Sequence, residues 1–421
     1  MKQSRGAVLA VPVACGLVIL AAAFGLRNQG TDAVVARNGA VELVVLSARD
    51  AGPGTLRDAI LAADRLSVRA HIVIKAKRIA VESRLPALIN PHGVQIDAAP
   101  GAGIIDAQHQ AAGPALEIDG ARSNLRGLTI TNARTCAVMV NAPGTQLESL
   151  TVKDSKVGIM VNATAPGTSI RTSLLEGDET GLVAEAGARD VSVVGDIFRL
   201  NSRAGFWFVG AADPKGEASE RDPRANARIR VVNGVFEKNA TGAVLANRLT
   251  IFEKDRFIAN REAAVTILGG AARVENSEIR GTVGTAIFVT SGRSVVLARN
   301  VLIDNAAAAL MIRDSEILIE GNTFRHNGLG IVSIGSPASI MPIIKDNLIT
   351  QTSADAITLI GGAALLQHNQ IVQNRGAGLR PLDLVQGRVR LKVDPRLDAN
   401  VFRGNGADVV QTSVYRLSGA L

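Results

Sequence analysis

The polar residues best suited to chemistry recur at a fixed interval in the N-terminal half of the chain. Asp119, Asn141, Asn162 and Glu185 follow one another at spacings of 22, 21 and 23 residues. If the chain forms coils of that length, these side chains stack on successive coils, roughly 5 Å apart. Carboxylates so placed could hold Ca²⁺, a cation that prefers several oxygen ligands, or could supply an acid and a base. They could equally form a solvated face.

Roles can be assigned to these residues as hypotheses. Asp119, Glu185 and Asp154, which lies in a turn between them, are the candidate catalytic carboxylates. Asn141 and Asn162 are candidate contacts to a substrate. No motif specifies a cofactor, so the presence of Ca²⁺ or of another metal stays open.

One insertion interrupts the interval just after this region. Residues 210–226, GAADPKGEASERDPRAN, lengthen one repeat, and such insertions form loops that often lie on the binding face. Trp207, the only tryptophan, lies three residues before the start of the insertion. Asp213, Lys215 and Arg221 in this loop are candidate substrate contacts, together with Trp207, which could stack on a sugar ring. Alternatively, the loop simply covers the tryptophan.

The elements that must position these residues are short aliphatic strands. Twelve segments consist of a small residue followed by alternating aliphatic residues, and ten of their eleven spacings lie between 21 and 26 residues. They begin at Ala115, Ala137, Gly158, Gly181, Gly205, Ala243, Ala264, Ala286, Ala309, Gly330, Ala356 and Gly378. A period near 22 residues without helical periodicity predicts an all-β, single-domain right-handed parallel β-helix of about 12 coils.

A second signature, N-x-[ILF]-x-x-N, accompanies the strands. It is complete at residues 300–305, 322–327, 369–374 and 400–405. Asparagine tolerates left-handed backbone and bonds neighbouring amides, so its recurrence predicts a stacked structural ladder rather than a binding site.

The residues between the inward aliphatic positions should point outward. These outward residues are Glu117, Met139, Met160, Val183, Trp207, Leu245, Thr266, Phe288, Met311, Val332, Thr358 and Arg380, with a one-residue slip conceivable near Ala243. Most are apolar, and a catalytic groove is normally polar. This apolar stripe therefore favours a surface covered by a loop or by a protein partner.

Open sheet edges at the ends of such a stack invite aggregation, so a cap is expected. Thr55 precedes a helical stripe formed by Leu56, Ala59, Ile60 and Ala63, with Thr55 as N-cap. We therefore predict an N-terminal cap with entry strands over residues 41–110 and coils over 111–421.

The first 30 residues have the pattern of an export leader. Lys2 and Arg5 precede an uncharged run over residues 7–26, long enough to cross a bilayer. Cleavage after Ala21-Ala22-Ala23 and retention as an inner-membrane anchor are both open. The expected location is periplasmic, membrane-anchored or secreted.

Charge and motifs exclude several classes. The chain has 46 Lys and Arg against 38 Asp and Glu, a net charge of +8, and 3% aromatic residues. This mild excess favours an anionic polysaccharide, whereas the dense basic runs and interleaved aromatics of nucleic-acid binders are missing. Dinucleotide, P-loop and paired zinc-ligand motifs are also missing.

The entry region carries a family resemblance. VLSARDAGPGTLRDAILAAD at 45–64, SRLPALI at 83–89 and GVQIDA at 93–98 resemble the start of exported bacterial β-helix proteins. The later coils resemble the pectate-lyase-like right-handed β-helix superfamily, particularly its carbohydrate-binding and sugar-hydrolase branch. That superfamily contains lyases, hydrolases, epimerases and noncatalytic adhesins, so the resemblance implies fold more than activity.

Known catalytic sets of the superfamily do not transfer. The N-x-D, D-D and G-H-G motifs of polygalacturonases are missing, and Asp394-Pro395-Arg396 lacks the histidine of the epimerase D-P-H-D motif. Two functions remain. The first is binding of an acidic polysaccharide, with or without lyase, hydrolase or epimerase activity. The alternative is a noncatalytic cell-envelope scaffold or adhesion rod that docks a protein partner on the apolar stripe. An accessory role in polysaccharide assembly or export fits both.

Overall fold

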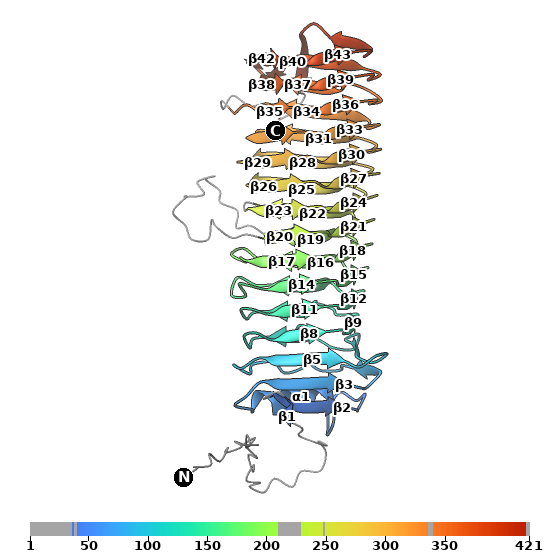
Figure 1. The fold of residues 1–421 in the computed structure, drawn as a ribbon, viewed down its shortest axis with the longest axis vertical. Helices are drawn as coiled ribbons and strands as arrows, with labels where there is room; N and C mark the ends of the chain where they lie inside the picture. Colours follow the sequence, from blue (N-terminus) through green and yellow to red (C-terminus); the bar gives the residue numbers. More distant parts are fainter. Residues whose placement is uncertain (1–35, 38–39, 209–228, 247–248, 336–339, 418–421) are drawn as a thin grey trace, which may run out of the picture. The chain divides into compact units, whose positions relative to one another are not determined.

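The computed structural model describes residues 36–37, 40–208, 229–246, 249–335 and 340–417. The predicted leader and the inserted loop at 210–226 lie outside these ranges. The described chain winds into coils whose strands form three long sheets (Figure 1). Nearly all strand pairs are parallel and join one coil to the next, which confirms the predicted all-β parallel β-helix.

Sheet 1 has 16 strands and starts at the N-terminal end. They are β1 (Ala36–Arg37), β2 (Ala40–Val45), β3 (Ala70–Ile74), β5 (Val94–Ala98), β8 (Asn124–Arg126), β11 (Gln146–Glu148), β14 (Ser169–Arg171), β17 (Val191–Val194), β20 (Ile229–Val232), β23 (Thr250–Glu253), β26 (Ala272–Glu275), β29 (Val295–Ala298), β32 (Ile317–Glu320), β35 (Ile343–Lys345), β38 (Gly362–Gln367) and β42 (Val393–Asp398).

Sheet 2 has 14 strands. They are β4 (Arg78–Ala80), β6 (Ile104–Asp106), β9 (Thr129–Thr131), β12 (Thr151–Lys153), β15 (Leu174–Glu176), β18 (Ile197–Arg199), β21 (Val235–Glu237), β24 (Arg256–Ile258), β27 (Glu278–Arg280), β30 (Val301–Ile303), β33 (Thr323–Arg325), β36 (Leu348–Thr350), β39 (Gln370–Val372) and β43 (Val401–Arg403).

Sheet 3 contains the twelve strands predicted from the repeat. They are β7 (Leu116–Ile118), β10 (Cys136–Val140), β13 (Val157–Val161), β16 (Thr180–Ala184), β19 (Ala204–Phe208), β22 (Thr241–Ala246), β25 (Ala263–Gly270), β28 (Thr285–Gly292), β31 (Ala308–Arg313), β34 (Leu329–Ile334), β37 (Ile357–Ile360) and β40 (Ala377–Gln386). We number the coils 1 to 12 from these strands. At the C-terminal end β41 (Val389–Leu391), β44 (Ala407–Val409) and β45 (Ser413–Leu417) pair with β40.

The strand alignment made from the sequence needs one correction. Phe206 of β19 pairs with Ala243 of β22, so Gly242 occupies the small-residue position that had been assigned to Ala243. A Cβ at Gly242 would lie 2.4 Å from the Ala264 carbonyl oxygen, which explains the glycine. Val244, rather than Leu245, therefore holds the outward position in this coil, and Leu245 is buried in the core.

The N-x-[ILF]-x-x-N signature spans two corners of one coil. In coil 8, Asn300 lies between sheets 1 and 2, Leu302 points into the core from β30, and Asn305 lies between sheets 2 and 3. The Asn300 backbone N–H donates to Asn322 Oδ1 at 2.8 Å, and the Asn305 N–H to Asn327 Oδ1 at 3.1 Å. The predicted ladder is therefore confirmed, as two ladders rather than one.

The N-terminal cap forms as predicted. Helix α1 (Leu56–Asp64) begins after Thr55, whose hydroxyl accepts the backbone N–H of Asp58 at 3.3 Å. Leu56 and Ile60 are buried against the first strands because the helical stripe faces the core. The SRLPALI segment at residues 83–89, which we call the entry segment, forms a single bridge between Leu88 and Ile118 instead of a strand. Within the described ranges, no helix is long and apolar enough to cross a membrane.

The C-terminal end of the apolar stripe is covered by the chain itself. β40 continues into an antiparallel hairpin with β41, and Leu384 and Leu391 of this hairpin pack with Val332 and Ile360 on the outer face of sheet 3. Part of the predicted cover over the stripe is thus this hairpin.

Candidate functional site

The predicted polar residues form a row along one margin of sheet 3. Asp119, Asn141, Asn162 and Glu185 directly follow β7, β10, β13 and β16. Their backbones stay in the sheet ladder, because Asn141 N–H donates to Ile118 O at 2.9 Å and the next two positions repeat this bond. We call these four residues the polar row.

The two asparagines link the row into a hydrogen-bonded chain. Asn162 Nδ2 donates to Asn141 Oδ1, and Asn141 Nδ2 donates to Asp119 Oδ1 at 2.7 Å and to Glu117 Oε1 at 3.3 Å. The donors all point toward coil 1. At the other end, Asn162 Oδ1 is buried without a hydrogen-bond partner. The amides therefore hold two carboxylates at the N-terminal end of the row.

Glu117 and Arg84 lie beside the polar row at its N-terminal end, in contact with each other. Neither was among the predicted site residues. Glu117 is the middle residue of β7, and its Oε2 accepts a hydrogen bond from Arg84 Nη2. Its side chain is only 13% exposed, whereas that of Arg84 is 58% exposed. The hydrogen bond and the charge of Glu117 raise the pKa of Arg84. Glu117 was detectable as the one carboxylate in the otherwise mainly apolar stripe, but nothing in the repeat pointed to Arg84.

The predicted catalytic carboxylates do not come together. Asp119 and Glu185 stand on coils 1 and 4, about 14 Å apart at one strand spacing per coil. The two carboxylates of glycoside hydrolases lie roughly 5–10 Å apart. Asp154 lies in the corner before β13, at the opposite margin of sheet 3 from the polar row. Glu117 and Asp119, which share the Asn141 donor, are the carboxylates that the fold brings together.

An apolar floor runs beside the polar row. Met139, Met160, Val183 and Trp207 occupy the outward positions of β10, β13, β16 and β19, in register and half-buried. The Arg203 guanidinium lies 3.8 Å from the Trp207 ring centroid, so one ring face is already occupied. Phe206 and Phe208, on either side of Trp207, fill the core.

The other predicted substrate contacts lie in the inserted loop. Asp213, Lys215 and Arg221 fall outside the described residues. Among the residues that the structure describes, no group of three or more His, Cys, Asp or Glu side chains is placed to hold a metal ion.

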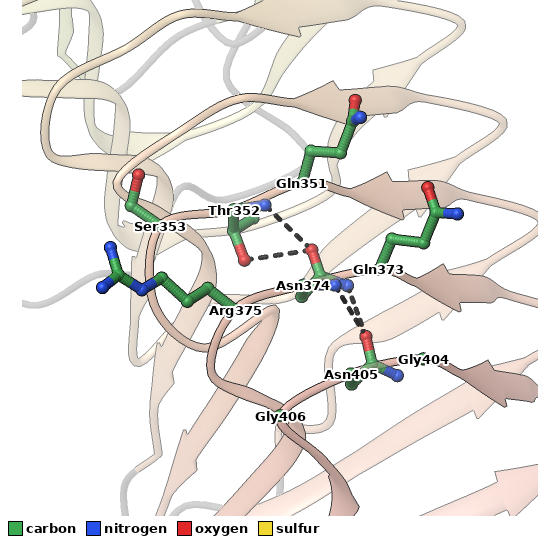
Figure 2. Close-up of a pocket in the computed structure, with 9 residues that line it drawn as sticks. All are labelled: Gln351, Thr352, Ser353, Gln373, Asn374, Arg375, Gly404, Asn405 and Gly406. Atoms are coloured by element: carbon green, nitrogen blue, oxygen red, sulfur yellow. Dashed lines mark hydrogen bonds between the residues drawn. The ribbon is translucent and has the colours of Figure 1, made fainter.

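A shallow hollow near the C-terminal end lies at the corner between sheets 2 and 3 (Figure 2). Figure 2 shows Asn374 Oδ1 accepting two hydrogen bonds from Thr352, and the Asn374 N–H and Nδ2 both donating to Asn405 Oδ1. Thr352, Asn374 and Asn405 are rungs of the ladder, and a Cβ at Gly406 would lie 2.3 Å from the Arg375 carbonyl oxygen, so only glycine fits there. The hollow is thus the end of a structural ladder, nine to eleven coils from Asp119.

Comparisons with known proteins agree on the fold. A family model described as a right-handed β-helix region matches residues 224–376. The A-module of mannuronan C-5 epimerase AlgE4 from Azotobacter vinelandii is 13% identical, with a TM-score of 0.54 over 88% of this chain and 97% of that one. The A-module of AlgE6 from the same organism is 12% identical, with a TM-score of 0.50 over 87% and 94%.

A third similar structure is the catalytic unit of a GH87 α-1,3-glucanase from Streptomyces thermodiastaticus, at 13% identity and a TM-score of 0.49, over 87% of this chain and 68% of that one. No curated protein matches the chain in sequence. At these identities the similarity shows the right-handed parallel β-helix fold that the entry region and coils resembled, and nothing about the reaction.

Proposed function

We propose that this chain is an exported protein that binds an acidic polysaccharide along the outer face of sheet 3, over coils 1 to 5, and modifies it at coil 1. The observation that carries the proposal is the shared Asn141 donor, which holds Glu117 and Asp119 beside Arg84. The two similar A-modules belong to enzymes named for mannuronan, an acidic polysaccharide, which supports this class of ligand.

The strip suits a sugar chain for two physical reasons. Its floor of Met139, Met160 and Val183 is apolar and can contact the C–H faces of sugar rings, while the polar row supplies amide and carboxylate partners for hydroxyls. Successive coils also repeat at about 4.8 Å, which is comparable to the length of one sugar residue. One residue of the polymer can therefore be contacted by each coil.

The chemistry at coil 1 follows from the residue types. Removing the proton next to a uronate carboxylate needs a base and a cation that neutralises the carboxylate. Asp119, exposed and oriented by Asn141, is the proposed base, and the exposed Arg84 is the proposed cation. The abstracted proton resides on Asp119. A proton delivered by water to the opposite face of the carbon gives an epimer, and Asp119 then loses its proton to solvent. If the bond to the glycosidic oxygen on the neighbouring carbon breaks instead, Asp119 gives its proton to that oxygen and an unsaturated end forms.

Two features of the protein indicate that the polymer is negatively charged. The net charge of +8 and the position of Arg84 favour a uronate polymer. Asn141, Asn162 and Glu185 favour hydroxyl contacts along the rest of the row. We therefore expect uronate recognition at coil 1 and hydroxyl recognition at coils 2 to 4.

A noncatalytic rod is favoured by a different observation. Phe288 and Met311, on coils 8 and 9, remain half-buried on the same face, beyond the polar row. This part of the stripe suits a protein partner. Retention of residues 7–26 as an anchor would hold such a rod at the inner membrane.

The test is an incubation of the chain from about residue 31 with polyuronates and neutral polysaccharides, followed by chromatography with mass detection and NMR. We expect a polyuronate to yield epimerised, unsaturated or shortened products. Asp119→Asn should reduce the rate by on the order of 100-fold or more, and Arg84→Ala should behave similarly. The matched control is Asp304→Asn, because Asp304 is an exposed carboxylate at a corner of coil 8.

Two outcomes oppose the proposal. Binding without products from any polymer would favour the noncatalytic rod. Full activity of both Asp119→Asn and Arg84→Ala would remove coil 1 from the reaction.

A further inference from the structure

Three rungs of the two ladders are aspartates where most rungs are asparagines. Asp178 lies in the ladder between sheets 2 and 3, and Asp196 and Asp255 lie in the ladder between sheets 1 and 2. All three side chains are buried, at 0%, 0% and 1% exposure. Each Oδ1 keeps the bond of a normal rung to a backbone N–H of the preceding coil. The donors are Ser155, Ser173 and Gly234, at 2.7, 2.6 and 2.6 Å.

The second oxygen of each aspartate breaks the pattern. In an asparagine rung, Nδ2 donates to a carbonyl of the preceding coil, as from Asn201 to Leu175 O at 3.2 Å. In the three aspartates the corresponding Oδ2 is buried and has no hydrogen-bond partner. The equivalence is visible at the neighbouring glycines. A Cβ at Gly158 would lie 2.9 Å from Asp178 Oδ2, and one at Gly181 would lie 3.2 Å from Asn201 Nδ2.

Only a protonated aspartate can replace the missing amide donor. An ionised carboxylate accepts hydrogen bonds but donates none, whereas the neutral acid has one O–H to donate. An ionised Oδ2 at this position would be buried without a hydrogen-bond donor. Leaving such a buried group unsatisfied destabilises the fold, and a charged group does so more than a neutral one.

The surroundings also oppose ionisation. Burial raises the pKa of Asp178 to about 8, of Asp196 to about 7 and of Asp255 to about 8. The charges of Asp154 and Glu176 add to the rise at Asp178. The neighbouring buried thiol of Cys136 stays neutral, because burial raises its pKa to about 12.

The carboxylates near these rungs are themselves paired. Glu176 lies 2.8 Å from Lys153 Nζ and 2.7 Å from Arg199 Nε. Glu253, whose charge acts on Asp255, lies 2.5 Å from Arg230 Nη2. Lys153, Arg199 and Arg230 therefore pair with the outward carboxylates of Glu176 and Glu253. These cations do not neutralise the buried aspartates.

We propose that Asp178, Asp196 and Asp255 are proton-carrying rungs, which join coils 2 to 6 firmly when neutral and weaken these joints when they ionise. Each aspartate has a higher pKa in the folded than in the unfolded chain. The stabilisation is therefore complete below about pH 4 and is lost as the pH rises through about 7 to 8. Coils 2 to 6 underlie most of the strip, but the proposal does not depend on any ligand.

The test compares thermal unfolding of the wild type and an Asp178→Asn/Asp196→Asn/Asp255→Asn variant between about pH 5 and pH 9. Asparagine donates at every pH and is the usual residue in these ladders, so the variant should fold. We expect the wild-type Tm to fall as the pH rises, and the variant to keep a higher Tm at pH 9 with a flatter profile. Asp190→Asn, at an exposed corner of coil 4, is the matched control and should follow the wild type.

A converse variant strengthens the test. Asn322→Asp places the same carboxylate in a buried rung of coil 9, where Asn322 Nδ2 now donates to Leu297 O at 2.8 Å. This variant should acquire an additional loss of Tm at alkaline pH. The proposal is overturned if the triple variant keeps the wild-type pH profile, or if Asn322→Asp lowers the Tm equally at pH 5 and pH 9.

Discussion

At the scale of single residues, the site depends on one amide. Asn141 Nδ2 is shared between Glu117 and Asp119, so its loss removes the donor that orients both carboxylates. Asn141→Ala should lower kcat/KM by about tenfold or more while the Tm changes little, since a hydrogen bond to a charged group contributes about 1.5–3 kcal/mol. Gln146→Ala, on the exposed face of sheet 1, is the control. Steady-state kinetics together with melting curves check this, and an unchanged kcat/KM would contradict the assigned role.

A second residue-scale effect concerns backbone strain. Leu200 has a φ of 59° and is 52% exposed, so it holds a left-handed conformation without burying its side chain. Glycine adopts this conformation freely. Leu200→Gly should therefore raise the free energy of unfolding by about 0.5–1 kcal/mol, after allowing for the greater flexibility of the unfolded chain. Denaturant titration measures the free energy of unfolding. A lower value for Leu200→Gly than for the wild type would show that the Leu200 side chain makes stabilising contacts.

At the scale of elements, each ladder rung joins three coils. Asn322 Oδ1 accepts from the Asn300 N–H and Nδ2, and Asn322 Nδ2 donates to Leu297 O, all in coil 8. The Asn322 N–H and Nδ2 also donate to Asn347 Oδ1 in coil 10. Asn322→Leu leaves these buried groups unsatisfied and should lower the free energy of unfolding by at least about 3 kcal/mol. Asn276→Leu at an exposed corner tests whether any corner asparagine would do the same. If both variants lose the same free energy of unfolding, the ladder asparagines contribute no more to stability than an exposed corner asparagine.

The elements were largely predictable because their causes are local and repeated. The 22-residue period located the sheet 3 strands, and the helical stripe after Thr55 located α1. The slip at Gly242 and Ala243 arose because two small residues are adjacent and both satisfy the strand pattern. The contact between Arg84 and Glu117 was not predictable, because Arg84 lies in the irregular entry segment, 33 residues away, where no repeat indicates its neighbours.

The candidate site was only partly predictable for a related reason. A repeat shows which residues share a margin of a sheet, so the polar row was found correctly. The repeat also implied that Asp119 and Glu185 stand three coils apart, which is too far for an acid and base pair. It does not say which corner a turn residue occupies, and Asp154 lies at the other margin.

At the scale of the whole coil stack, the strip sets the length of ligand that can be bound. Coils 1 to 5 span about 20 Å at one strand spacing per coil. Affinity should therefore rise with oligosaccharide length up to about four or five residues and then level off. Calorimetry on a size-graded series checks this. An affinity already maximal for a disaccharide would confine binding to coil 1.

The most direct test of the central claim uses Trp207, the only tryptophan in the chain, which lies at the coil 5 end of the strip. Its fluorescence should change and saturate on titration with an oligosaccharide of the polymer that is bound, in parallel with binding heat. Asn162→Ala should shift the titration to higher ligand concentration. If calorimetry records binding while the Trp207 signal stays constant and Asn162→Ala binds as well as the wild type, the glycan does not lie on this face.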